Sequence, residues 1–254
     1  GLGDGHFGDG ITTGSRANIT IFKTTGFDNF PSVYHGDGLA RDFDGDGIVD
    51  VLFGNGASSQ LFVGLGRGDG TFAQSFYNAQ YTPDIGTGVL RGDSNMSSLN
   101  VADYNMDGVN DVLVVSHRNS VRPGGAAVVL GDRPGTLRAI HQVQYADDNL
   151  GYFYVTADFN NDGIPDLATL SNSVSVALGR GDGTFAPFAL GIHVPAGGGE
   201  FLSASLIAAD FDHDGNVDLA WCGLDSVQGG APPRYLQAFG LGNGTFQLMS
   251  VINV

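Results

Sequence analysis

The sequence predicts an all-β protein, and three of its features carry that prediction. First, its 254 residues include 41 Gly and 26 Asp but only one Glu and one Lys. Gly and Asp favour turns and disfavour helix interiors, whereas Glu and Lys are the usual residues of exposed helix faces. Second, the apolar stretches are short, and third, two short motifs each recur four times along the chain. Composition alone therefore argues against a helical or α/β fold.

The first recurring motif is acidic and has the pattern Asp-x-Asp/Asn-x-Asp-Gly-x-x-Asp. Its four copies start 61, 55 and 52 residues apart and occupy residues 42–50, 103–111, 158–166 and 210–218. The second motif is rich in glycine, follows the pattern Leu-Gly-Arg-Gly-Asp-Gly-Thr-Phe with variations, and occupies residues 65–72, 130–137, 178–185 and 241–246. Because the two motifs stay in phase four times, the chain consists of internal repeats. We place the repeat units at approximately 1–67, 68–130, 131–180 and 181–254.

Each repeat contains four short apolar segments of strand-like sequence. One precedes the acidic motif, one follows it, one precedes the glycine-rich motif and one follows that. Four short strands per repeat are typical of a β-propeller blade. A parallel β-helix would need shorter repeats, and an immunoglobulin-like sandwich would not repeat internally. The sequence therefore predicts a single β-propeller over residues 1–254, with four four-stranded blades and an extra outer strand at the N-terminus.

The acidic motif has the spacing of a calcium loop. Ca²⁺ takes about 6–8 oxygen ligands, and Gly at loop position 6 permits the sharp turn that lets positions 1, 3 and 5 converge. A backbone carbonyl at position 7 and a carboxylate at position 9 would complete the set. We therefore expect about four Ca²⁺ ions. The predicted metal ligands are Asp42, Asp44, Asp46, Ile48 and Asp50; Asp103, Asn105, Asp107, Val109 and Asp111; Asp158, Asn160, Asp162, Ile164 and Asp166; and Asp210, Asp212, Asp214, Asn216 and Asp218.

The acidic motif has two alternative interpretations. An EF-hand opens in the same way, but it needs Glu at position 12 and flanking helices. Position 12 instead holds Phe53, Val114, Thr169 and Trp221, in strand-like sequence. The other interpretation is an acidic turn without a metal, in which carboxylates this close would repel one another. Asn at position 3 lowers the charge of the second and third loops, so we expect these two to bind more weakly.

Together, the two motifs resemble the FG-GAP repeat, also called the VCBS repeat, of integrin α-subunits and fungal lectins. The resemblance covers all four units. It implies a β-propeller with calcium loops, in a family that includes adhesion proteins, lectins and non-catalytic modules of secreted enzymes. Proteins of this family usually carry seven blades, and the chain begins with Gly1–Phe7, which matches a glycine-rich motif. We therefore expect a part of a larger propeller, or a ring completed by another chain.

Charge and composition exclude several partners. A formal net charge of −16 argues against nucleic acid and against an anionic membrane surface. No run approaches 18 apolar residues, so we expect no insertion into a membrane. The single cysteine, Cys222, suits an extracellular protein that avoids free thiols, and we expect a secreted protein. Arg-Gly-Asp occurs at 67–69, 91–93 and 180–182, but two of these copies belong to the glycine-rich turn.

The sequence favours sugar binding over catalysis. It contains no Gly-x-Ser-x-Gly and no His-Glu-x-x-His motif, so we expect a protein that is not an enzyme. Aromatic and polar side chains between blades suit a carbohydrate, which predicts a lectin-like protein. The alternatives are a structural or adhesion module that assembles with copies of itself or with a protein partner, and an accessory domain of a secreted enzyme. The candidate ligand-binding residues are Tyr77, Tyr81, Arg91, Asn95, Tyr145, Tyr152, Tyr154 and His193.

Overall fold

The computed structural model describes nine stretches of the chain. They are residues 38–55, 60–78, 96–116, 125–133, 135–143, 153–170, 173–193, 205–223 and 234–253. All of them belong to one compact unit, His35–Val254. These residues form sixteen β-strands and no helix, so none of them offers a helix that could span a membrane. The all-β prediction is confirmed, whereas the predicted extra strand near Gly1–Phe7 lies outside the described residues.

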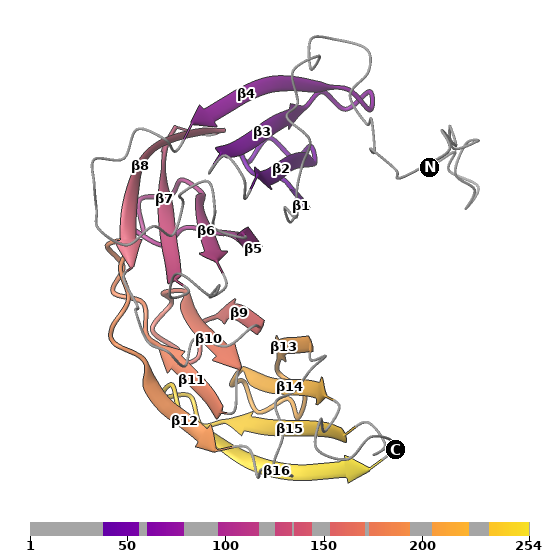
Figure 1. Cartoon of the computed structure of the whole chain (residues 1–254), viewed down its shortest axis with the longest axis vertical. Helices are drawn as coiled ribbons and strands as arrows, with labels where there is room; N and C mark the ends of the chain where they lie inside the picture. Colours follow the sequence, from indigo (N-terminus) through magenta and orange to yellow (C-terminus); the bar gives the residue numbers. More distant parts are fainter. Residues whose placement is uncertain are drawn as a thin grey trace, which may run out of the picture. The chain divides into compact units, whose positions relative to one another are not determined.

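The strands form four separate four-stranded sheets, each built from consecutive antiparallel strands (Figure 1). The first sheet contains β1 (Gly38–Arg41), β2 (Asp50–Asn55), β3 (Gln60–Gly66) and β4 (Phe72–Asn78). The second contains β5 (Met96–Ala102), β6 (Asp111–Ser116), β7 (Gly125–Arg133) and β8 (Thr136–Val143). The third contains β9 (Phe153–Ala157), β10 (Asp166–Leu170), β11 (Ser173–Ala177) and β12 (Ala189–His193). The fourth contains β13 (Ser205–Ala209), β14 (Asp218–Gly223), β15 (Arg234–Gly240) and β16 (Phe246–Asn253).

The two sequence motifs occupy the same connections in every sheet. The acidic motif joins the first two strands, and the glycine-rich motif joins the last two. The Asp that ends each acidic motif pairs with the last residue of the preceding strand, in the pairs Arg41–Asp50, Ala102–Asp111, Ala157–Asp166 and Ala209–Asp218. This is the blade topology that the sequence predicts. The first three sequence units end at the glycine-rich motif, so each of the first three sheets takes its fourth strand from the following unit.

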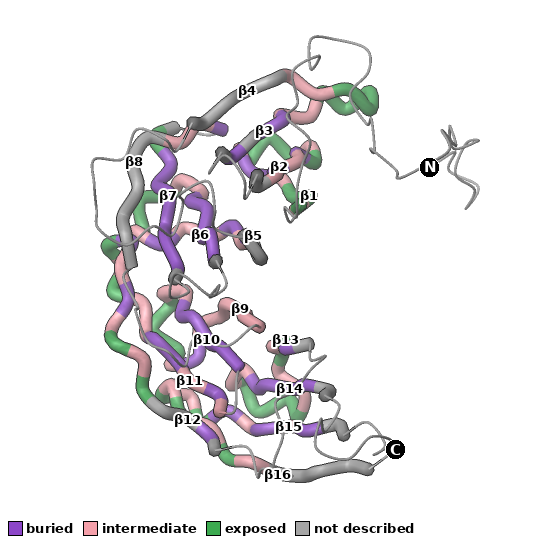
Figure 2. The backbone as a smooth tube through the Cα atoms, in the orientation of Figure 1, coloured by how far each residue is buried: buried purple, intermediate pink, exposed green. Residues whose placement is uncertain are grey.

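The middle strands of the sheets form the core. All five residues of β10 are buried, and the described side chains of β6 and β14 are buried as well (Figure 2). Each hydrophobic cluster draws on two consecutive sheets: the first and second share one cluster, the second and third another, and the third and fourth a third. Strands buried on both faces read as continuous apolar runs, which explains the unbroken sequence Val112–Val115. Consecutive sheets are therefore held together face to face by apolar packing.

Candidate metal centre in the acidic loops

Each acidic loop is shaped by hydrogen bonds from its own backbone to its own carboxylates. In the first loop, Asp42 accepts the N–H of Gly45 at 2.7 Å and that of Gly47 at 2.9 Å. Asp44 accepts the N–H of Asp46 at 3.1 Å, and Asp46 accepts that of Ile48 at 2.7 Å. The other three loops repeat the bonds from positions 5, 6 and 7. The side chains at positions 1, 3 and 5 are thus all turned toward the backbone of their own loop.

Two positions of each loop have left-handed backbone conformation. Position 6 is Gly in all four loops, with φ between 82° and 92° at Gly47, Gly108, Gly163 and Gly215. Few residues other than Gly adopt such a φ without strain, which explains why this position is invariant within the chain. Position 4 also has positive φ, yet it holds Met106 and Asn161 at 61° and His213 at 63°. The loop therefore tolerates side chains at position 4, where His213 is exposed.

The Asp at position 9 connects the acidic loop to the glycine-rich turn of the same sheet. Asp50 is fully buried and its Oδ2 accepts the N–H of Phe43 at 2.7 Å and that of Asp44 at 3.2 Å. Its Oδ1 accepts the N–H of Gly66, the first glycine of the turn, at 2.7 Å. The position-9 residues Asp111, Asp166 and Asp218 are buried in the same way, and each accepts the N–H of the position-2 residue and the N–H of the corresponding glycine. This Asp therefore has a structural role in addition to its predicted role as a metal ligand.

Burial perturbs the acidity of these carboxyl groups. It raises the pKa of Asp166 to about 6, against the opposing effect of the hydrogen bonds from Gly179 and Phe159. Burial likewise raises the pKa of Asp111. In the first loop, desolvation raises the pKa of Asp44, and the nearby charges of Asp50, Asp46 and Asp42 act in the same direction. A cation at these loops would favour the ionised carboxylates and so oppose these effects.

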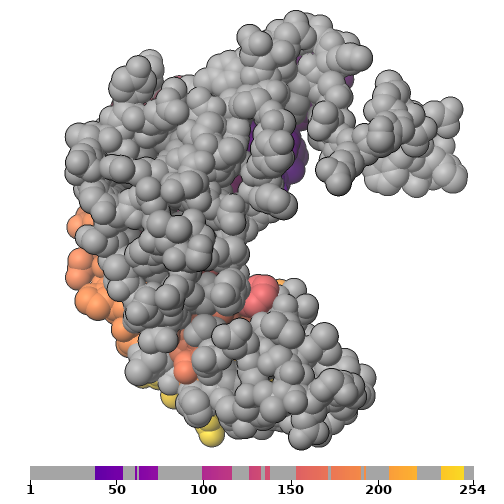
Figure 3. Space-filling view, in the orientation of Figure 1, coloured from indigo at the N-terminus to yellow at the C-terminus, as the bar shows by residue number. Residues whose placement is uncertain are grey.

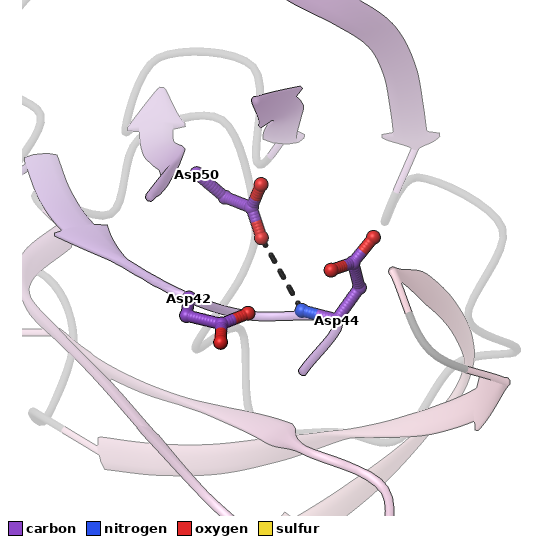
Figure 4. A group of neighbouring side chains, drawn as sticks. All are labelled: Asp42, Asp44 and Asp50. Atoms are coloured by element: carbon purple, nitrogen blue, oxygen red, sulfur yellow. Dashed lines mark hydrogen bonds between the residues drawn. The ribbon is translucent and has the colours of Figure 1, made fainter. Parts of the chain in front are cut away.

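Two of the loops gather three carboxylates tightly. Asp42, Asp44 and Asp50 each offer one oxygen atom, and these atoms lie within 4.8 Å of one another (Figure 4). Asp210, Asp212 and Asp218 form the equivalent group in the fourth loop. Among the described residues, these two are the groups in which three or more His, Cys, Asp or Glu side chains could hold a metal ion. Oxygen donors are the ligands that hard cations such as Ca²⁺ prefer, so the donor set fits that ion.

The second and third loops differ because Asn replaces Asp at position 3. Asn105 Nδ2 donates to Asp107 Oδ2 at 2.9 Å, and Asn160 Nδ2 donates to Asp162 Oδ2 at 2.8 Å. In these two loops an amide N–H therefore stabilises the negative charge of the position-5 carboxylate by a hydrogen bond. In the fourth loop the position-7 side chain does the same, since Asn216 Nδ2 donates to Asp214 Oδ2 at 2.8 Å.

The repeated motifs and their geometry agree with a known sequence family. A model described as an FG-GAP-like repeat matches residues 42–114, 103–169 and 158–221, which together make up well over half of the chain. The chain belongs to the FG-GAP-like repeat family. Each match begins at the first Asp of one acidic loop and ends in the strand that follows the next loop. The resemblance that the sequence indicated is therefore confirmed, as is the β-propeller fold that it implied.

Comparison with solved structures identifies a related architecture for these FG-GAP-like repeats. A structure of a lectin from Agrocybe aegerita superposes with a TM-score of 0.59 at 20% sequence identity. The match covers 87% of this chain and 53% of the lectin, so the chain spans about half the lectin's length. That lectin is described as recognising non-reducing terminal N-acetylglucosamine. At this identity the likeness concerns the fold. No curated protein sequence matches the chain significantly.

Most of the candidate ligand-binding residues lie outside the described part of the FG-GAP-like repeats. Five of the eight lie outside the described residues: Tyr81, Arg91, Asn95, Tyr145 and Tyr152. Tyr77 and His193 belong to β4 and β12, where they pair with Leu61 and Ser173 through the strand register. Tyr154 of β9 is half-buried and packs against the cluster shared by the second and third sheets. For Tyr154, the structure therefore shows packing between blades.

Two of the three Arg-Gly-Asp sequences form the same tight turn. Asp69 Oδ1 accepts the N–H and the hydroxyl of Thr71 at 2.9 Å and 2.6 Å, and Asp182 Oδ1 accepts both groups of Thr184 at the same distances. These bonds lower the pKa of both Asp residues. The second of these turns belongs to the third sheet, and residues of this sheet form the orange area of the molecular surface (Figure 3). In these two turns the Asp carboxylate thus stabilises the turn itself. The third Arg-Gly-Asp sequence lies outside the described residues.

Sequence reasoning missed the hydrogen bonds that connect the acidic loops of consecutive sheets. Asn110 Nδ2 of the second loop donates to Phe43 O of the first loop at 2.8 Å. Asn161 Nδ2 of the third loop donates to Asn216 Oδ1 of the fourth at 2.8 Å. Both residues fall at variable positions of the motif, so no repeated signal marks them in the sequence.

Proposed function

We propose that this chain is a calcium-stabilised, non-catalytic β-propeller module that binds carbohydrate outside the cell. The observation that carries the calcium part is the convergence of three carboxylate oxygens within 4.8 Å in the first and fourth acidic loops. The carbohydrate part is supported by the fold that the chain shares with a lectin recognising terminal N-acetylglucosamine.

The charge of the chain supports a role for divalent cations. Its formal net charge is −16, and each acidic loop contributes three or four of the Asp residues. Close carboxylates repel one another, and a divalent cation turns that repulsion into attraction. In the first loop, Asp42, Asp44 and Asp50 would hold the ion, with Asp46 and the carbonyl of Ile48 as further predicted ligands. When bound, Ca²⁺ supplies a cross-link between residues that are distant along the loop, rather than a reactive centre.

The distribution of acidic residues also supports a non-catalytic role. The chain has a single Glu, Glu200, so general acid–base chemistry would depend on Asp. Within the described residues, the Asp side chains of the acidic loops and of two glycine-rich turns accept backbone hydrogen bonds that shape those turns. An extracellular location suits both a calcium-dependent fold and the near absence of cysteine.

Calcium binding is tested by removing the metal. If the loops bind Ca²⁺ only in the folded state, each site adds about 2.7 kcal/mol at a hundredfold excess of ion over Kd. We expect EDTA to lower the melting temperature markedly, and elemental analysis to find calcium in the native protein. Asp214→Ala should abolish part of the calcium effect, whereas the exposed-turn variant Asp69→Asn should leave it unchanged. An identical melting temperature with and without calcium, together with no bound metal, would contradict the proposal.

Carbohydrate binding is tested by calorimetry with simple sugars, starting with N-acetylglucosamine. Because the four blades are similar, we expect several weak sites, with Kd between millimolar and micromolar, or about −4 to −8 kcal/mol. Tyr81→Ala and Tyr145→Ala should weaken binding, whereas the control Tyr104→Phe keeps a buried ring and should not. Silence across a broad glycan array would exclude the lectin-like function and favour assembly with other chains.

A further inference from the structure

One peptide group in the first acidic loop is hydrogen-bonded on both sides. The N–H of Asp44 donates to Asp50 Oδ2 at 3.2 Å, and the carbonyl of Phe43, which belongs to the same peptide group, accepts Asn110 Nδ2 at 2.8 Å. Asn110 lies at position 8 of the second loop, 67 residues further along the chain. Because a peptide group is a rigid plane, the donor on its carbonyl side helps to fix the direction of its N–H.

The next pair of sheets repeats this arrangement with a different donor. The N–H of Asn105 donates to Asp111 Oδ2 at 3.2 Å, and the carbonyl of Tyr104 in the same peptide group accepts the N–H of Gly183 at 3.0 Å. Between the third and fourth sheets, the carbonyl of Phe159 accepts the N–H of Gly244 at 2.9 Å. In three consecutive loops, the carbonyl at position 2 therefore accepts a hydrogen bond from the following sheet.

We propose that Asn110 is a positioning residue for the cation of the first loop, although it belongs to the second loop. The inference rests on the proposed calcium binding and names a residue that would tune it. Asn110 acts through the peptide group between Phe43 and Asp44, which holds Asp50 in place beside Asp42 and Asp44. By thermodynamic reciprocity, a cation in the first loop strengthens the contact between the first and second sheets.

Of the three donors to a position-2 carbonyl, Asn110 is the one that a side-chain substitution can remove. At the two later contacts the donor is the backbone N–H of Gly183 or Gly244, which no side-chain change deletes. Position 8 of the other loops is Val49, Pro165 or Val217, so the loop itself does not require Asn there. Asn110 is half-buried, and the first and fourth loops carry Val at this position. Asn110→Val therefore removes the donor with little other disturbance.

The size of the effect follows from the behaviour of residues that orient metal ligands. Substitutions of such residues typically lower metal affinity by about 10–100-fold. The hydrogen bond of Asn110 acts on Asp50 through one intervening peptide group, and Asp50 keeps its bonds from Phe43 and Gly66. We therefore expect Asn110→Val to weaken calcium binding by about tenfold, the lower end of that range, at the first loop alone.

The test is a calcium titration of the whole chain by calorimetry, combined with a double-mutant cycle. Asn110→Val is made in the unaltered chain, in an Asp42→Ala background that disables the first loop, and in an Asp103→Ala background that disables the second. Asn110→Leu, which is close to Asn in shape, serves as a second variant should Val disturb folding. Val49→Ala is the matched control, because it lies at the same loop position with its side chain 57% exposed.

The expected result separates an action on the first loop from an action on the second. The loss of affinity should persist in the Asp103→Ala background and disappear in the Asp42→Ala background, and Val49→Ala should not reproduce it. The opposite dependence, or unchanged affinity in a chain that binds calcium, would overturn the inference while leaving the proposed calcium binding intact. Absence of calcium binding by the unaltered chain would overturn both.

Discussion

Asp50 Oδ1 accepts the backbone N–H of Gly66 at 2.7 Å, and this bond joins the two motifs that mark each repeat. The same bond recurs between Asp111 and Gly131 at 2.8 Å, between Asp166 and Gly179 at 2.7 Å, and between Asp218 and Gly240 at 2.8 Å. Gly240 directly precedes residues 241–246 and corresponds to Gly66 when Phe246 is aligned with Phe72. The last Asp of the acidic loop and the first glycine of the turn therefore form one structural unit. Their contact explains why the two motifs keep phase along the chain.

This contact predicts that position 9 supports the fold even without metal. Asp50→Asn replaces one accepting oxygen by an amide that faces backbone donors, and a buried donor without an acceptor costs about 1–3 kcal/mol. We expect the free energy of unfolding in EDTA to fall by that amount. Asp42→Asn affects a more exposed carboxylate, where water can replace a lost bond, so its main effect should be a smaller gain on adding calcium. Chemical denaturation with and without calcium measures both. Equal stability of Asp50→Asn and the unaltered chain in EDTA would contradict the prediction.

The first glycine of the turn donates its N–H to the position-9 Asp, and we predict that it is also required because a larger residue would not fit. A Cβ added to Gly179 would lie 2.5 Å from the carbonyl oxygen of Pro165 and 2.6 Å from Ile164 Cγ2. We expect Gly179→Ala to destabilise the protein by about 1–3 kcal/mol, the usual cost of overpacking. Gly45→Asn is the control, because a Cβ there meets no atom within 4 Å and three other loops carry side chains at that position. Its cost should stay within about 1 kcal/mol in the same denaturation experiment.

The sequence predicted the fold and the acidic loops because the contacts that define them lie within one repeat. Asp50 and Gly66 are 16 residues apart, and the equivalent pairs are 20, 13 and 22 residues apart, so the recurring motif residues mark this contact in every sheet although their separation varies. The side-chain contacts between acidic loops of different repeats leave no such trace. Asn110 and Phe43 are 67 residues apart, and Asn161 and Asn216 are 55 apart. The donors Asn110 and Asn161 stand at motif positions where the other repeats carry different residues. The structural role of position 9 was missed for a related reason, since a ligand carboxylate and a backbone-binding carboxylate have the same sequence signature.

The Arg-Gly-Asp turns allow a prediction about acidity. The hydroxyl of Thr184, followed by its backbone N–H, lowers the pKa of Asp182 below its ordinary value of 3.8. Because the folded-state pKa is lowered, the stabilisation is present above the unfolded pKa and is lost as the pH falls through the folded pKa. Thr184→Val removes the hydroxyl and keeps the N–H, so the pKa of Asp182 should rise toward 3.8. An NMR titration measures it, with Thr71→Val and Asp69 as the matched pair. An unchanged pKa would show that the hydroxyl does not hold this carboxylate.

The last prediction concerns the two loops that carry Asn at position 3. Asn105→Asp removes the hydrogen bond from Asn105 to Asp107 and adds a fourth carboxylate to the loop, beside Asp103 and Asp111. Without metal, the added repulsion should lower the melting temperature in EDTA. With calcium, affinity should rise, because the affinity of such loops increases with ligand charge, and we expect about tenfold, or 1.4 kcal/mol.

The two effects of Asn105→Asp have opposite signs, and this opposition identifies a metal-binding loop. An acidic turn that binds no metal would show the loss in EDTA and no gain when calcium is added. Asn160→Asp should repeat the pattern in the third loop, where Asn160 donates to Asp162 in the same way. The reverse change in the first loop, Asp44→Asn, should raise stability in EDTA and lower calcium affinity. It removes a carboxylate whose pKa is raised by desolvation and, in the same direction, by the nearby charges of Asp50, Asp46 and Asp42. Melting curves in EDTA and calcium titrations of these three variants therefore decide whether the charge at position 3 sets the strength of each site.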